Sequence, residues 1–116
     1  MHRIGGSRVE NLRLKPREAT LDPPGISLLH APSPGEAARQ MREAFPAATA
    51  LHHAAQVIAS TTVDKIRQAG FAVFPNPTKK LPQHYRLIHP EGVAGFTDAN
   101  LLRLSAVFIE TSRHRL

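Results

Sequence analysis

The polar side chains with the best spacing for chemistry lie between residues 71 and 90, where cationic groups gather without an acid among them. No aspartate or glutamate occurs from residue 65 to residue 90. Clustered basic side chains favour phosphate groups, and a tyrosine beside them can stack on a base or on a nicotinamide ring. The stretch therefore predicts a basic functional face formed by Lys79, Lys80, His84, Tyr85, Arg86 and His89. The structural alternative is a solvated hairpin tip for the lysines and simple packing for the tyrosine.

The spacing of the histidines and serines gives less support to a metal site or a nucleophilic serine than to the basic face. On a strand, His84 and His89 point to opposite faces, because side chains alternate and the two are an odd number of positions apart. His52 and His53 are adjacent and would point about 100° apart on a helix, which is poor geometry for chelation. Ser27 could meet His84 as a nucleophile–base pair, but the chain has no Gly-x-Ser-x-Gly elbow. We therefore predict no metal site and keep Ser27 as a candidate polar group.

Two short strands joined by a stiff loop are predicted to position the basic face. Residues 71–74 and 85–89 are runs of strand length, and a proline follows each. Pro75, Pro77 and Pro82 fix φ and remove backbone donors, so neither strand is expected to extend into the loop.

Helices are predicted on both sides of this strand pair. The clearest covers 32–45, where Ser33 is a good N-cap, Pro34 occupies the first helical position and Glu36 completes a capping box. Further helices are predicted over 47–59, between Thr61 and Gly70, and over 98–110 after the expected cap Thr97.

The N-terminal part is predicted to be extended. Residues 1–8 look like a mobile basic arm, and residues 12–15 alternate as a short half-buried strand, with a helical turn as the alternative. The breaker Pro-Pro-Gly precedes a strand over 26–29. The whole predicts one compact α+β domain over residues 9–112, with short strands, three to four helices and a basic tail over 113–116.

Composition restricts the classes of function. The chain has 116 residues, with 15 lysines and arginines against 9 acids, for a formal net charge of +6. This excess favours polyanionic partners, such as nucleic acid, nucleotides or an acidic protein. The absence of cysteine excludes a disulfide framework. No apolar run approaches the ~20 residues of a membrane span and no secretory signal is recognisable, so cytoplasmic residence without membrane association is expected.

Three short segments resemble small bacterial toxins with an ADP-ribosyltransferase-like fold, including toxin–antitoxin and type VI-secreted forms. A short leading segment over residues 11–14, Asn-Leu-Arg-Leu, carries an arginine at Arg13. Residues 24–28 resemble that group's Gly-x-Ser-hydrophobic strand, and residues 82–90 resemble a late His-Tyr-x-hydrophobic strand followed by proline. Together these segments cover about a quarter of the chain.

The resemblance implies an NAD-dependent ADP-ribosyltransferase acting as a toxin, with an acidic, antitoxin-like protein as its partner. It implies that Arg13 positions NAD, Ser27 supports the nicotinamide ribose and Tyr85 stacks on the ring. His84 would be a polar contact beside them. The remaining basic residues of the face, Lys79, Lys80, Arg86 and His89, would bind substrate.

Two alternatives remain open from the sequence. The domain could be a non-catalytic basic module that binds an acidic protein or nucleic acid through residues 79–86. It could also be an RNA-cleaving toxin in which His84, Arg86 and His89 supply acid, base and phosphate clamp, since such cleavage needs two groups of differing pKa near one phosphate.

Overall fold

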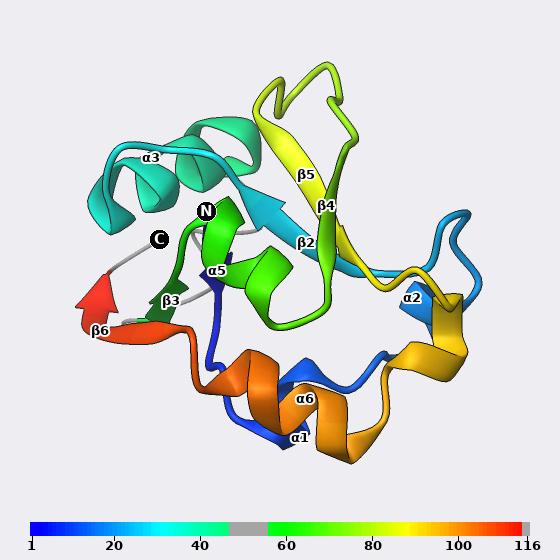
Figure 1. The fold of residues 1–116 in the computed structure, drawn as a ribbon. Helices are drawn as coiled ribbons and strands as arrows, with labels where there is room; N and C mark the ends of the chain where they lie inside the picture. The colour runs from blue at the N-terminus through cyan, green and yellow to red at the C-terminus, as the bar shows by residue number, and fades with distance from the viewer. Residues whose placement is uncertain (47–55, 115–116) are drawn as a thin grey trace.

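A six-stranded sheet forms the centre of the molecule (Figure 1). The computed structural model describes residues 1–46 and 56–114. Along the sheet the strand order is β4-β5-β2-β1-β3-β6, and the paired strands are antiparallel. The strands are β1 (His2–Ile4), β2 (Ile26–Leu29), β3 (Gln56–Ser60), β4 (Ala72–Pro75), β5 (His84–Ile88) and β6 (Ile109–His114). The α+β class predicted from the sequence is confirmed.

The sheet is only weakly joined between β1 and β2. These strands pair at a single position, His2 opposite Leu29. On either side of them the pairing is closer, because β1 pairs with β3 at three positions and β2 pairs with β5 at four. The two strands therefore diverge, and each half of the sheet is held together mainly by its own ladder.

The helices fill the two faces of this sheet. Figure 1 shows α1 and α6 side by side, with α5 near the middle of the molecule and α3 beside the β1–β3–β6 half. Their bounds are α1 (Val9–Leu12), α2 (Pro16–Ala19), α3 (Pro34–Ala44), α5 (Val63–Gln68) and α6 (Asp98–Ser105), with a 3-10 turn, η1 (Gly92–Gly95). None of the helices in the described part of the chain is long and apolar enough to cross a membrane.

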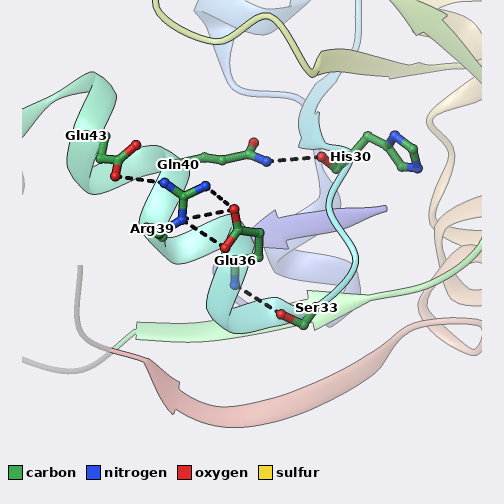
Figure 2. A network of polar contacts seen from close by, with 6 residues as sticks. All are labelled: His30, Ser33, Glu36, Arg39, Gln40 and Glu43. Atoms are coloured by element: carbon green, nitrogen blue, oxygen red, sulfur yellow. Dashed lines mark hydrogen bonds and ion pairs between the residues drawn. The ribbon is translucent and has the colours of Figure 1, made fainter.

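Local capping signals explain where α3 begins. The Ser33 hydroxyl accepts a hydrogen bond from the Glu36 amide over 3.1 Å, as the capping box predicts. The other half of the box is not formed, because the Glu36 carboxylate binds the guanidinium of Arg39 one turn later (Figure 2). Arg39 also reaches Glu43 over 2.7 Å, so the outer face of α3 carries a local ion-pair chain.

Two apolar clusters pack on the sheet. The main core joins β2 and β5 to α1, α5 and α6, and its fully buried members include Leu12, Leu28, Ile66, Leu87, Leu101 and Leu104. A second cluster joins Leu29 to α3 and to Leu81. Ser27 is exposed between the buried side chains of Ile26 and Leu28, as the alternation of a strand predicts.

The structure differs from the sequence prediction at residues 1–8. The predicted mobile arm contains β1, a strand with neighbours on both sides. Met1 and His2 are buried, and the β1 backbone pairs with residues 58–60. The glycines and basic residues of the arm gave no local sign of this pairing, which depends on a strand more than fifty residues later.

Three other segments also adopt structures different from those predicted. Residues 12–15 are not a strand: Leu12 ends the short helix α1, which agrees with the helical-turn alternative, and residues 13–15 connect α1 to α2. The predicted helix over 47–59 is wrong at 56–59, which belong to β3, while 47–55, with His52 and His53, lie outside the described residues. The last helix stops at Ser105, and β6 continues through residue 114, into the predicted basic tail. At residues 56–59 and 109–110, strand pairing outweighs local helix propensity.

Candidate functional site

A cleft opens where β1 and β2 diverge, and we call it the β1–β2 cleft. Every residue of both strands lines it, together with residues from α2, the end of α3, the 78–81 loop and β5. Its volume of about 510 Å³ lies in the usual range for small-molecule sites. The polar lining side chains are His2, Arg3, Lys15, Glu18, Ser27, Thr78 and His84, and the apolar ones are Ile4, Ile26, Leu28, Leu29, Met41, Phe45 and Leu81.

The cationic side chains of the cleft are Arg3 and Lys15. Arg3 donates to the main-chain oxygens of Gly6 over 2.7 Å and of Asn11 over 3.0 Å. Its Nε is buried and has no hydrogen-bond partner among the described residues. Burial lowers the pKa of Arg3, and the nearby carboxylate of Glu18 opposes part of this shift. Two cations against one lining carboxylate favour an anionic ligand.

Ser27 and His84 approach the cleft from neighbouring strands. Ser27 lies opposite Arg86 in the β2–β5 ladder, and His84 lies opposite Leu29. The Nδ1 of His84 is 2.9 Å from the main-chain oxygen of Asn76. The adjacent strands therefore bring a hydroxyl and an imidazole to the same cleft, although they are 57 positions apart in the sequence.

His2 lines the same cleft but has both ring nitrogens engaged. Nε2 lies 2.8 Å from the main-chain oxygen of Ala31, and Nδ1 lies 2.7 Å from the hydroxyl of Ser60. A carbonyl oxygen can only accept, so Nε2 carries the proton and Nδ1 accepts from Ser60. Burial lowers the pKa of His2 and so favours the neutral ring.

Two of the four predicted catalytic residues lie away from the cleft. Arg13 contacts the carboxylate of Asp98 through nitrogen–oxygen distances of 3.1 and 3.2 Å, which raises the pKa of the guanidinium. Tyr85 follows His84 on β5 and points to the other face, where it packs against the main core and lies edge-on to His30. Ser27 and His84 thus share a cleft that neither Arg13 nor Tyr85 lines.

The four predicted substrate-binding residues also lie outside the cleft lining. Arg86 is buried and donates to the main-chain oxygen of Pro23 over 2.7 Å, which ties β5 to the loop before β2. The His89 ring lies edge-on to Phe71, with 4.9 Å between ring centroids. Lys79 and Lys80 are exposed in the loop after β4.

Lys80 nevertheless lies close to one wall of the cleft. Its Nζ is 5.2 Å from the centre of the Phe45 ring, and Phe45 is a lining residue. Lys80 also borders a second hollow of about 470 Å³ between α3 and residues 80–83. Arg39, on the rim of that hollow, is engaged by the two carboxylates shown in Figure 2, which leaves little net charge there for a ligand.

Sequence reasoning missed three of the cleft's charged residues, namely Arg3, Lys15 and Glu18. Arg3 was part of the predicted mobile arm, whose charge was visible but whose strand pairing was not. Lys15 and Glu18 had a clearer signal, because Lys-Pro-x-Glu places proline at the first helical position and glutamate two positions later. The structure has that arrangement, with the Lys15 amide bonded to the Glu18 carboxylate over 2.8 Å.

No group of three or more metal-ligating side chains is found among the described residues. Comparisons with protein-family models, with curated proteins and with solved structures find no match to this chain.

Proposed function

We propose that the chain is a toxin domain of a bacterial toxin–antitoxin or type VI-secreted system that binds NAD in the β1–β2 cleft and transfers its ADP-ribosyl group. One observation carries the proposal: a cleft of nucleotide-accommodating size has two cations at Arg3 and Lys15, with Ser27 and His84 on its wall. The Ser27 and His84 segments are two of the three on which the sequence resemblance rests.

The lining residues fit the chemical parts of NAD. Arg3 and Lys15 place two cations on the lining of the cleft, and such a pair suits a diphosphate. The exposed hydroxyl of Ser27 suits a ribose hydroxyl. Met41 and Phe45 supply apolar surface for a flat ring. In this proposal Arg3 takes the role that the resemblance gives to Arg13, and Phe45 takes that of Tyr85.

The chemistry that NAD supplies is an activated ribose with nicotinamide as the leaving group. The protein's part is to hold the diphosphate, orient the ribose and exclude bulk water from one side of it. An ordered cleft between two strand ladders suits this task, because its walls are fixed by main-chain hydrogen bonds.

Calorimetric titration of NAD into the wild-type protein tests the proposal. Binding is expected, and Lys15→Gln should weaken it because one of the two cations is lost. Arg13→Gln is the matched control, since that exposed side chain is bonded to Asp98 outside the cleft. Equal NAD affinity in wild type and Lys15→Gln would contradict the site, and no NAD binding by the wild type would contradict the function.

Expression in bacteria gives a cellular test of the same proposal. The wild-type chain should inhibit growth in the cytoplasm, and labelled NAD should mark a target in cell extract. A small acidic protein encoded beside this chain should relieve the inhibition, since a basic surface suits an acidic partner. Harmless expression with intact NAD, together with steeply salt-dependent binding of polyanions, would instead favour the non-catalytic binding module.

A further inference from the structure

We propose that His84 is the general base of the β1–β2 cleft, with Nε2 as the proton-accepting atom. The inference rests on the proposed function, because it names the group that would activate the acceptor in that reaction. It starts from one contact, the 2.9 Å distance between His84 Nδ1 and the main-chain oxygen of Asn76.

This contact determines the tautomer of the neutral ring. A main-chain oxygen has no hydrogen to give, so the hydrogen in this bond belongs to Nδ1. The side-chain nitrogen of Asn76 also lies near Nδ1, but at 3.4 Å it is at the limit of a hydrogen bond. The shorter contact prevails, because an unprotonated Nδ1 would place its lone pair against that of the carbonyl. Nε2 therefore keeps its lone pair.

The segment that carries Asn76 is held rigidly against β5. The Asn76 amide donates to the main-chain oxygen of His84 over 3.0 Å, so the two residues are bonded in both directions. The His84 amide donates to the oxygen of Leu81 over 3.1 Å, and the Leu81 amide donates to the hydroxyl of Thr78 over 2.9 Å. Prolines within the same loop restrict φ further. A base held in this way needs little reorganisation to act.

The other titratable groups of the cleft are less suited to accept a proton. His2 uses both ring nitrogens in hydrogen bonds to Ser60 and Ala31. The Glu18 carboxylate accepts from the Lys15 amide and lies in the field of Arg3. Arg3 and Lys15 are cations. For the described part of the chain, the free Nε2 of His84 is the best-placed proton acceptor.

The bond between ribose C1′ and the nicotinamide nitrogen breaks, and its electron pair leaves with nicotinamide. A bond forms between C1′ and the acceptor oxygen, which is water or a hydroxyl of the target. The proton of that oxygen moves to His84 Nε2, which makes the ring a cation that solvent later deprotonates.

Turnover of NAD with water as the acceptor measures the role of His84. We expect His84→Gln to lower kcat for nicotinamide release by about 100-fold or more, the usual contribution of a general base, while the affinity for NAD changes little. His30→Gln is the matched control, because this exposed histidine lies outside the cleft. Unchanged kcat in His84→Gln would overturn the inference and leave the proposed function standing. A loss of kcat in Glu18→Gln but not in His84→Gln would have the same meaning. A wild type that neither binds nor cleaves NAD would overturn both.

The tautomer gives a second test that does not depend on turnover or on the folding of a variant. Nitrogen-15 NMR of the wild-type histidines at alkaline pH should show His84 with its proton on Nδ1 and an unprotonated Nε2. Addition of NAD should shift the Nε2 signal, since His84 lines the occupied cleft. A proton found on Nε2 would overturn the inference whatever the kinetics show.

Discussion

The imidazole of His2 accepts a hydrogen bond from the hydroxyl of Ser60, with 2.7 Å between Nδ1 and Oγ, and so links the central strand β1 to β3 through side chains as well as main chain. Its other nitrogen donates to the main-chain oxygen of Ala31, beyond the end of β2. One buried ring therefore ties together the two sheet halves at the point where the β1–β2 cleft begins. The protonation state of this ring should matter to stability.

Protein stability should fall as the pH is lowered below about 6.5, the usual pKa of an unfolded histidine. Burial lowers the pKa of His2 in the folded state, so the unfolded chain binds the extra proton first. The stabilisation is fully present above the unfolded pKa and is lost as the pH falls through the folded pKa. Urea unfolding between pH 8 and pH 5 measures this, with His2→Gln as the comparison. The same pH slope in both proteins would show that His2 does not carry the effect.

Arg13→Ala should leave NAD affinity and growth inhibition at wild-type levels. Its guanidinium pairs with Asp98, and both side chains are largely exposed, so solvent screens the pair and its loss should scarcely change the thermal midpoint. Arg3→Lys keeps a cation in the cleft but loses the planar fork, and should weaken NAD binding. Calorimetric titration of NAD into each variant measures the two affinities. A large loss of affinity in Arg13→Ala would move the site away from β1.

Leu104→Ala should destabilise the domain by about 2–5 kcal/mol, because the side chain is fully buried between α6 and the sheet and its removal leaves a cavity. Leu102→Ala is a control on the same helix, since that side chain is 65% exposed. The control should stay within about 0.5 kcal/mol of wild type. Equilibrium denaturant unfolding measures both. Similar losses in the two variants would mean that α6 does not bury the face described.

Gly95→Ala should destabilise the chain by about 1–3 kcal/mol, the usual cost of forcing extra atoms into a packed site. A Cβ at this buried position would overlap the ring of His89, which is itself packed on Phe71. Gly35→Ala is the contrasting change, because a Cβ in this first turn of α3 would meet only the hydroxyl oxygen of Ser33, at an ordinary contact distance of 4.0 Å. Thermal unfolding should show a lower midpoint for the first variant and an equal or higher one for the second. No difference between them would contradict the close approach of Gly95 to His89.

Local signals explain which parts of the fold could be predicted from the sequence. Prolines and cap residues predicted α3 and the hairpin of β4 and β5 close to their observed bounds, because they act within a few positions of the chain. Strand alternation placed Ser27 on the opposite face from Ile26 and Leu28, and the structure shows the same. The alternation that separates His84 from Tyr85 was equally readable, yet a shared site was predicted for both.

The sequence alone determined the α+β class, the basic character of the chain and the two polar residues that reach the cleft from β2 and β5. The wall of the cleft that β1 forms depends on tertiary structure. β1 pairs with β3, and β3 with β6, across 49 to 58 positions of the chain, and nothing local in the Met-His-Arg-Ile start of the chain marks a central strand. Arg3 lines the cleft because β1 pairs with its neighbouring strands. Arg13 lies outside the cleft, where it pairs with Asp98. Which strands become neighbours in a sheet depends on both segments together, so neither segment's sequence predicts the pairing by itself.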